Sequence, residues 1–248
     1  MKTMSRRALL AGGVAAAAGA LVASGRRFGL VPPDWRGPYG PGETLSYAAH
    51  RLAGRHAAAR EFPREMISAK PFANTIYPPL SDEFKRQHAE NVGNWKLQVE
   101  GQVQRTLSLS IGELQEMERR SQITEVVCEE GWSYIAEWTG TPLSTVFSAV
   151  GLQPSARYVV YFSSDPEWWE SIDIDEAMHP QTLLAWAMNG AELPMPFGGP
   201  LRMRVPRQLG YKSVKFINRL VVTDSLEGFG DGTGQSAVNK GYAWYAGI

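Results

Sequence analysis

Cys128 is the one cysteine of the chain and therefore its one soft, anionic metal ligand. It ends the short run Ile123 to Cys128, which is rich in residues that favour strands, and it precedes a Glu-Glu-Gly-Trp-Ser loop. A lone cysteine is often a small buried apolar residue, but strand ends are where sites are commonly mounted. No His or Cys stands nearby at zinc spacing, so this thiolate would hold a metal only if a cofactor supplied the other ligands.

A group of cations, Arg202, Lys212 and Lys215, is the second candidate site. Two of them stand in the loop Gly210-Tyr211-Lys212-Ser213-Val214-Lys215, where backbone N–H groups, a hydroxyl and a lysine are close enough to cradle a phosphate. Arg202 would add a fork of donors to the same anion. The alternative is that Arg202 and Arg204 form the solvated, polar face of a strand.

Other polar and aromatic residues are weaker candidates. His179 is expected to be a structural turn or core histidine. Glu129 and Glu130 are adjacent at a strand end, so we expect their side chains to point apart and not to form an acid/base pair. The pair Trp168-Trp169 and the cluster Tyr242 to Tyr245 either line a pocket or close a core.

Many short strands with helices between them are expected to position these residues. Alternation of apolar and polar residues predicts strands near 95–99, 107–109 and 201–205. Runs rich in β-branched and other apolar residues predict strands at 123–128, 158–162 and 216–222. A capping box predicts a helix from Ser110 to about Arg119, and another helix is expected between Thr141 and Gly151. Asn189-Gly190 predicts a hairpin turn between strands 183–188 and 191–195. The pattern indicates a mixed α+β fold.

Composition narrows the class of protein. The 248 residues include 25 Lys and Arg against 25 Asp and Glu, and a chain without surplus positive charge is not expected to bind nucleic acid. A hydrophobic content of 44% is that of an ordinary globular protein. The single cysteine excludes an intrachain disulfide framework and any protein site that needs several cysteines.

The N-terminal segment predicts export. The basic residues Lys2, Arg6 and Arg7 precede an uncharged Ala, Gly, Leu and Val run from Ala8 to Ala23, which is too short to span a bilayer but fits a signal-peptide core. The arginine pair before this run indicates the twin-arginine route, with an ordinary secretory signal or an uncleaved anchor as alternatives. We therefore expect a signal peptide at 1–24, an extended lead-in at 25–70 with a helix between Tyr47 and Arg60, and a periplasmic domain at 71–248.

Several motifs follow one another in the mature part of the chain: Val127 to Ser133, Trp138 to Leu143, Asp175 to Ala185, Asn189-Gly190, Gly199 to Arg202 and Gly210 to Lys215. In this order and at this spacing they resemble the sulfite oxidase family of molybdenum–molybdopterin enzymes. The resemblance extends from about Asn74 to Ile248. It implies a single mixed, β-rich α+β domain around a buried molybdopterin cofactor.

The resemblance also implies roles for individual residues. Cys128 falls on the family's protein ligand to molybdenum, and the dithiolene of the pterin would supply two further sulfurs, which answers how one cysteine holds a metal. The contacts to the phosphate and pterin of Mo-molybdopterin fall on these residues: Arg202, Ser213, Val214 and Lys215. Weaker matches to pterin contacts are Asn74, Tyr77 and Ser163. By loose analogy, Tyr242 would lie near the metal as a hydrogen-bonding group.

The chain departs from the family pattern in two places. Phe197 stands where relatives usually carry His or Asn as a cofactor contact, which leaves one polar contact in doubt. Sulfite oxidisers follow the cysteine with a run that ends in paired arginines, whereas Glu-Glu-Gly-Trp-Ser follows it here, and this run is more similar to that of the catalytic subunit of periplasmic methionine sulfoxide reductase. Two carboxylates that faced the metal would repel sulfite.

The leading hypothesis is thus a periplasmic molybdopterin oxidoreductase that moves an oxygen atom at a sulfur-containing substrate, with sulfoxide reduction preferred over sulfite dehydrogenation. The sequence has no Cys-x-x-Cys-His haem motif, so electrons are expected to pass to or from a separate protein, a haem-containing membrane subunit or a soluble cytochrome. A rival of another class is a metal-free, exported, β-rich binding module in which Cys128 only packs. A cofactor-loaded protein that has lost turnover is a third, weaker hypothesis.

Overall fold

The computed structural model describes residues 24–25, 29–37, 39–74, 82–236 and 241–248, apart from the side chains of residues 83, 84 and 87. The chain divides into two compact units, Met1–Arg55 and His56–Ile248. The expected signal peptide, residues 1–24, lies almost entirely outside the described residues. In the first unit α2 (Gly40–Ala53) begins with a proline in its first turn and ends before Gly54, so the helix expected between Tyr47 and Arg60 lies earlier than predicted.

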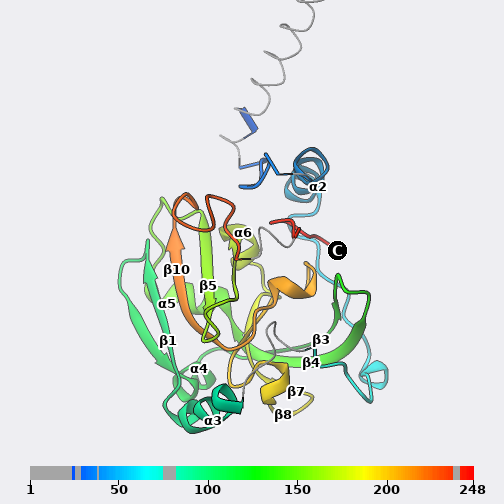
Figure 1. The fold of residues 1–248 in the computed structure, drawn as a ribbon, viewed down its shortest axis with the longest axis vertical. Coiled ribbons are helices and arrows are strands. Elements are labelled where there is room, and N and C mark those ends of the chain that lie inside the picture. Colours follow the sequence, from blue (N-terminus) through cyan, green and yellow to red (C-terminus); the bar gives the residue numbers. More distant parts are fainter. Residues whose placement is uncertain (1–23, 26–28, 38, 75–81, 237–240) are drawn as a thin grey trace, which may run out of the picture. The chain divides into compact units, whose positions relative to one another are not determined.

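The second unit is built on two sheets (Figure 1). The strands of the first, in spatial order, are β2 (Leu107–Ser110), β1 (Lys96–Gly101), β10 (Ile217–Thr223), β5 (Tyr158–Ser163) and β6 (Trp169–Asp173). Only β1 and β10 pair in parallel. The second sheet is antiparallel and contains β3 (Arg120–Val127), β4 (Ser133–Pro142), β7 (Leu183–Met188) and β8 (Ala191–Glu192), with β9 (Arg202–Arg204) also paired to β7.

Short helices occupy the connections. The α-helices of this unit are α3 (Asp82–Asn91), α4 (Ile111–Glu116), α5 (Leu143–Val150) and α6 (Ile174–Ala177). Single 3-10 turns are η1 (Arg64–Met66), η2 (Val92–Asn94), η3 (Met195–Phe197) and η4 (Gly210–Lys212). Among the described residues of this unit, more lie in strands than in helices, which confirms the predicted mixed, β-rich α+β class.

Burial follows the alternation in the sequence. In β1, Leu97 and Val99 are fully buried while Lys96 and Gln98 are exposed, as a half-buried strand requires. The larger apolar cluster packs α5 and β9 against the first sheet. A smaller cluster on β4 and β7 includes Trp138 and lies beside the connection that carries the cysteine.

Short-range signals in the sequence predicted several of the turns and helix starts. Ser110 and Glu113 form the predicted capping box at the start of α4, although this helix ends at Glu116, earlier than expected. Asn189 and Gly190 both have positive φ in the β7–β8 turn, which is the conformation that this dipeptide favours. The second strand of that hairpin is only two residues long because η3 replaces its predicted end.

The lead-in from His56 onward covers an open strand edge of the second sheet. The N–H of Phe62 donates to the carbonyl of Ile123 at 2.9 Å, and the N–H of Ser68 donates to the carbonyl of Ile135, also at 2.9 Å. Ile123 lies in the edge strand β3, and Ile135 lies in the part of β4 that β7 does not pair, so both bonds satisfy backbone groups that would otherwise be open to pairing with another chain.

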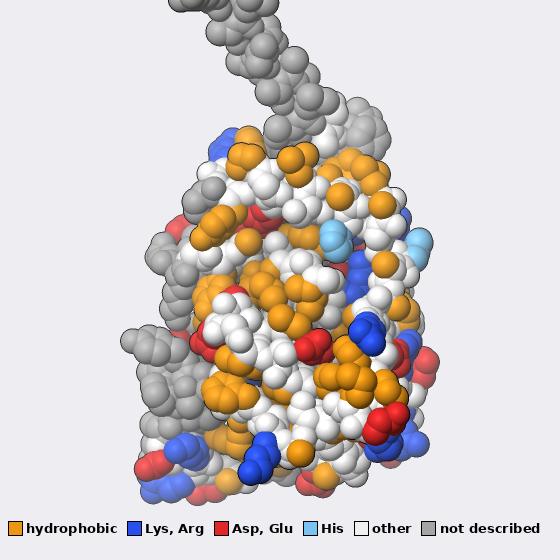
Figure 2. Space-filling model, turned by 90° about the vertical axis from the view of Figure 1, so that its right-hand side faces the viewer, with side chains coloured by type: hydrophobic (Ala, Val, Ile, Leu, Met, Phe, Trp, Pro, Cys, Tyr) orange, Lys and Arg blue, Asp and Glu red, His pale blue; other side chains and the backbone are white. Residues whose placement is uncertain are grey.

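The surface carries both signs of charge. On the face in Figure 2, hydrophobic side chains form several separate groups, with acidic and basic side chains interspersed between them. A mixed surface of this kind agrees with the balanced composition. Among the described residues, no helix combines the length and the apolar character needed to cross a membrane.

Candidate functional site

Cys128 lies at the start of the tight connection between β3 and β4 and is 7% exposed. Its N–H donates to the carbonyl of Trp132 at 2.9 Å, and its own carbonyl accepts from the N–H of Gly131 at 3.1 Å. Gly131 has φ of +90°, in the region where only glycine is unstrained. The Glu-Glu-Gly sequence therefore turns the chain within three residues and holds the thiol at a fixed place at the sheet edge.

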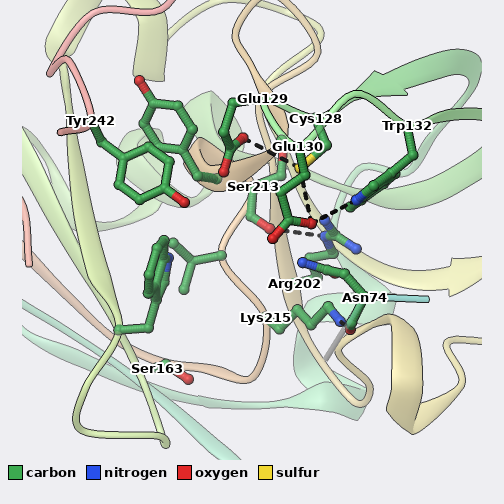
Figure 3. A pocket seen from close by; sticks show the side chains of 14 residues that line it. Asn74, Cys128, Glu129, Glu130, Trp132, Ser163, Arg202, Ser213, Lys215 and Tyr242 are labelled. Atoms are coloured by element: carbon green, nitrogen blue, oxygen red, sulfur yellow. Dashed lines mark hydrogen bonds between the residues drawn. The ribbon is translucent and has the colours of Figure 1, made fainter. Parts of the chain in front are cut away.

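The thiol faces a cavity of about 440 Å³, a size suited to a small molecule or cofactor (Figure 3). The residues that line it are Asn74, Cys128, Glu129, Glu130, Trp132, Ser163, Trp168, Arg202, Gly210, Tyr211, Ser213, Val214, Lys215 and Tyr242. They come from the segment before α3, the β3–β4 connection, the end of β5 and the β5–β6 connection, β9, η4 and the loop after it, and the C-terminal segment. Apart from Tyr77, which lies outside the described residues, every residue that the sequence assigned to the cofactor lines this one cavity.

Two buried cations form one side of the cavity. Arg202 is 4% exposed and donates from Nε to the carbonyl of Ser213 and from Nη1 to the carbonyl of Phe197, both at 3.0 Å. Lys215 is 9% exposed, and its Nζ donates to the carbonyls of Asn74 and Pro196, both at 2.7 Å. Burial, and secondly the charge of Arg202, lowers the pKa of Lys215 to about 7. Both cations would gain from an anion placed in the cavity.

Arg204 is also buried, at 1% exposed, so the alternative of a solvated strand face is wrong. Its guanidinium donates to Thr124 Oγ1 at 3.1 Å and to Ser213 Oγ at 3.3 Å, behind the loop that lines the cavity. Burial, and then Arg202, lowers the pKa of Arg204 to about 9. None of the ion pairs between described residues involves Arg202, Arg204 or Lys215.

Lys212 does not line the cavity, in contrast to the hypothesis from its spacing. It is fully buried, and its Nζ lies 2.8 Å from Glu170 Oε2 and 3.1 Å from the carbonyl of Ser171. This ion pair joins η4 to β6. Lys212 therefore anchors the loop from behind while Ser213, Val214 and Lys215 are presented to the cavity.

Two carboxylates converge on the thiol, where the sequence predicted that they would point apart. Glu129 Oε2 lies 3.3 Å and Glu130 Oε2 3.8 Å from Cys128 Sγ, and Glu130 also accepts a hydrogen bond of 2.7 Å from Trp132 Nε1 (Figure 3). The prediction failed because these residues belong to a turn, in which the alternation of a strand does not apply. Burial first, and then the two carboxylates, raise the pKa of Cys128 to about 12.

Aromatic rings wall the opposite side. Tyr242 lies 4.8 Å from Tyr211 and 5.9 Å from Trp168 between ring centroids, and all three line the cavity. Burial, and then the charge and hydrogen bond of Glu129, raise the pKa of Tyr242. From the sequence, these aromatic clusters could either line a pocket or close a core. In the structure Trp168 and Tyr242 line the cavity, whereas Trp244 is buried in the interior. Tyr211 was not singled out, and only its place in the glycine-led loop hinted at it.

Phe197 contributes its backbone and not its ring. Its carbonyl accepts from Arg202, and its ring packs on Tyr134 with centroids 5.8 Å apart, outside the residues that line the cavity. His179, likewise, is buried away from the cavity, and burial lowers its pKa to about 4, in keeping with the structural role expected of it.

The donor set fits molybdopterin. Among the described residues, no three His, Cys, Asp or Glu side chains gather where they could hold a metal ion, so a metal beside Cys128 needs ligands from elsewhere. A dithiolene supplies soft sulfur ligands that complement a single thiolate. Arg202 and Lys215, buried with carbonyl partners, suit a phosphate group. The cavity therefore offers a metal ligand at one side and an anion site at the other.

Comparison with known proteins gives a family and a set of relatives. The model of the oxidoreductase molybdopterin binding domain matches residues 85–228. A protein of Azospira oryzae, provisionally named as the protein-methionine-sulfoxide reductase subunit YedZ1, is 35% identical over 186 residues, which are 75% of this chain and 66% of that protein. The protein-methionine-sulfoxide reductase catalytic subunit MsrP of Xanthomonas campestris is 35% identical over 152 residues, which are 55% of this chain and 47% of that protein.

The chain thus spans between about half and about two thirds of the length of these curated relatives. Among solved structures, the sulfane dehydrogenase SoxCD from Paracoccus pantotrophus has a similar fold, with a TM-score of 0.52 and 20% sequence identity. That similarity covers 70% of this chain and 47% of the SoxCD chain. At this identity it supports the sulfite-oxidase-type fold and nothing about substrate.

Proposed function

Because the chain belongs to the sulfite oxidase family of molybdopterin-dependent oxidoreductases, we propose that it catalyses oxygen-atom transfer at sulfur, in the direction of sulfoxide reduction. The reaction takes a sulfoxide, two electrons and two protons to a thioether and water. Methionine sulfoxide is the substrate class in the names of the relatives, and this supports the choice of a sulfoxide.

The observation that carries the direction is the position of the two carboxylates. Glu129 and Glu130 lie within 3.8 Å of the sulfur that we assign to the metal. Charges of this sign repel anionic sulfite at the point where it would have to react, whereas a sulfoxide is neutral. The contacts of both carboxylates with the cysteine sulfur therefore support a site that disfavours sulfite.

The cofactor, when bound, supplies the two-electron oxygen-atom chemistry, and the chain supplies position and electrostatics. Cys128 would provide the thiolate ligand. Arg202 and Lys215, with the backbone and side chains of Ser213, Val214, Asn74 and Ser163, would hold the pterin and its phosphate. The rings of Tyr242 and Trp168 line the same cavity and add apolar surface to its wall.

Turnover of paired substrates tests this function. The molybdenum-loaded protein would be supplied with a reduced viologen dye and a sulfoxide, and separately with sulfite and an oxidised acceptor dye. We expect the sulfoxide to oxidise the viologen and sulfite to give no rate above a cofactor-free control. Sulfite oxidation without sulfoxide turnover would make the protein a sulfite dehydrogenase.

The same proposal includes location and electron supply. The arginine pair at residues 6–7 and the uncharged run after it support export by the twin-arginine route to the periplasm. The words "subunit" and "catalytic subunit" in the names of the relatives support a separate redox partner. A haem-containing membrane subunit or a soluble cytochrome would supply the electrons, because the sequence has no haem attachment motif of its own.

A further inference from the structure

The cavity is electrostatically two-sided. Its cations, Arg202 and Lys215, are at most 9% exposed, whereas Glu129 and Glu130 are exposed to solvent (Figure 3). We call this exposed carboxylate pair the acidic rim. Since the buried cations suit the anionic part of the cofactor, the acidic rim is the charge that remains for an arriving substrate.

Aromatic rings accompany the acidic rim on both sides. Trp132 follows it in the same turn, is partly exposed, and donates from Nε1 to Glu130 at 2.7 Å. Across the cavity Tyr242 packs edge-on against Trp168, with ring centroids 5.9 Å apart. Glu130 thus lies at the Nε1 edge of the Trp132 ring, and the carboxylates and the rings border the same opening. Carboxylates attract cations by their charge, and aromatic rings add the attraction of their negative faces.

The ring of Phe72 extends this surface outward. Phe72 is 53% exposed, and its ring lies 5.0 Å from that of Trp132 between centroids. Trp132 in turn stacks on Tyr134 at 5.9 Å with the ring planes 9° apart, which fixes its orientation. The rim therefore continues into an exposed aromatic edge that a chain longer than a single amino acid can contact.

We propose that the acidic rim selects methionine sulfoxide that is flanked by lysine or arginine in a polypeptide. This inference rests on the proposed sulfoxide reduction and names its substrate more narrowly. The methionine sulfoxide side chain enters the cavity beside Cys128, while a neighbouring cationic side chain lies between Glu129, Glu130 and the ring of Trp132. An acidic neighbour at the same place meets two like charges and is disfavoured.

The size of the preference follows from the exposure of the carboxylates. Exposed ion pairs contribute little, so a basic neighbour at the rim is expected to raise kcat/KM about fivefold relative to alanine, and an acidic neighbour there to lower it by a similar factor. The effect is expected to shrink with added salt, because charges at this exposure are screened. A small, salt-dependent ratio distinguishes recognition by charge from recognition by shape.

Three peptides of equal length test the proposal on the molybdenum-loaded protein. They carry methionine sulfoxide between two lysines, two alanines or two glutamates, with blocked ends. We expect kcat/KM to fall in the order lysine, alanine, glutamate at low salt, with at least a tenfold ratio between the first and the last. Equal values for all three peptides would overturn the charge preference and leave sulfoxide reduction standing. Failure to reduce any of them, or dimethyl sulfoxide, would overturn the proposed function and this inference with it.

Variants of Glu129 and Glu130 test whether the acidic rim causes the preference for basic neighbours. Glu129→Gln and Glu130→Gln keep the size of each side chain and remove its charge, so each is expected to reduce the ratio between the lysine and glutamate peptides, and both together to abolish it. The measured quantity is this ratio, which a uniform loss of activity does not move. Glu116→Gln is the matched control, since Glu116 is an exposed glutamate of α4 outside the cavity. A ratio unchanged in the double variant would overturn the assignment to the rim.

Discussion

At the scale of the residue, Lys215 illustrates how the cavity is prepared for an anion. Its amino group is buried next to Arg202 and is hydrogen-bonded only to backbone carbonyls among the described residues. Burial lowers its pKa from 10.5 to about 7, so the folded, cofactor-free protein loses this proton at a pH where the unfolded chain still holds it. Stability contributed by Lys215 therefore rises as the pH increases from about 7 towards 10.

We expect the cofactor-free wild type to gain about 2–3 kcal/mol of unfolding free energy relative to Lys215→Met between about pH 7 and about pH 9.5. Urea unfolding of both proteins at the two pH values measures the difference. A difference that stays constant, or that shrinks as the pH rises, would contradict the assigned burial. A phosphate placed beside Lys215 favours its charged form, so binding of the cofactor is expected to remove the effect.

The sequence predicted which residues of the site come together, but it did not predict the direction of every side chain. The types and order of Cys128, Arg202 and Lys215 carried enough chemistry to bring them to one site. The burial of Arg204 could not be read from its strand, because alternation assigned it to the polar face. Its guanidinium donates from its two Nη atoms to Ser213 and Thr124, which are 9 and 80 residues away, and no pattern within the strand indicates such partners.

At the scale of the element, the ion pair between Lys212 and Glu170 joins the loop 210–215 to the first sheet. Both side chains are fully buried and their charged atoms lie 2.8 Å apart. Lys212→Met leaves a carboxylate in the interior without its cation, and we expect it to cost about 3–5 kcal/mol of unfolding free energy. Lys96→Met is the matched control, because the pair of Lys96 with Glu113 is half exposed at 3.6 Å and contributes at most about 0.5 kcal/mol.

Chemical denaturation of the two variants checks this difference. Adding Glu170→Gln to Lys212→Met removes the stranded charge and is expected to recover part of the loss. Equal and small losses in the Lys212 and Lys96 variants would show that the buried pair does not fasten the loop.

Elements with strong local signals were predicted well, and those set by long-range contacts were not. The Asn189-Gly190 turn and the Ser110 capping box act within a few residues, so the sequence shows them directly. The loop after Cys128 was also expected, but the directions of Glu129 and Glu130 were wrong, because the alternation of a strand was applied to residues that belong to a turn. The resemblance implied a single β-rich α+β domain, and the arrangement of its strands in two sheets was not predicted.

At the scale of the whole molecule, the route of export is a prediction from residues that lie outside the described part of the chain. Replacing Arg6 and Arg7 together by lysine keeps the charge but removes the pair that the twin-arginine route reads. We expect the variant to accumulate in the cytoplasm, and cell fractionation measures this. Lys2→Arg is the control, since it leaves the pair intact. Unchanged export of the double variant would indicate an ordinary secretory signal.

The central claim is that this fold holds a molybdenum cofactor through Cys128. Elemental analysis tests it most directly, on protein exported with its own signal from a host that makes molybdopterin, beside a Cys128→Ala variant. We expect about one molybdenum atom per chain in the wild type, and loss of the metal or an altered optical spectrum in the variant, because the thiolate is its one protein ligand. Absence of molybdenum from both proteins would contradict the account and leave a metal-free, exported binding module in its place.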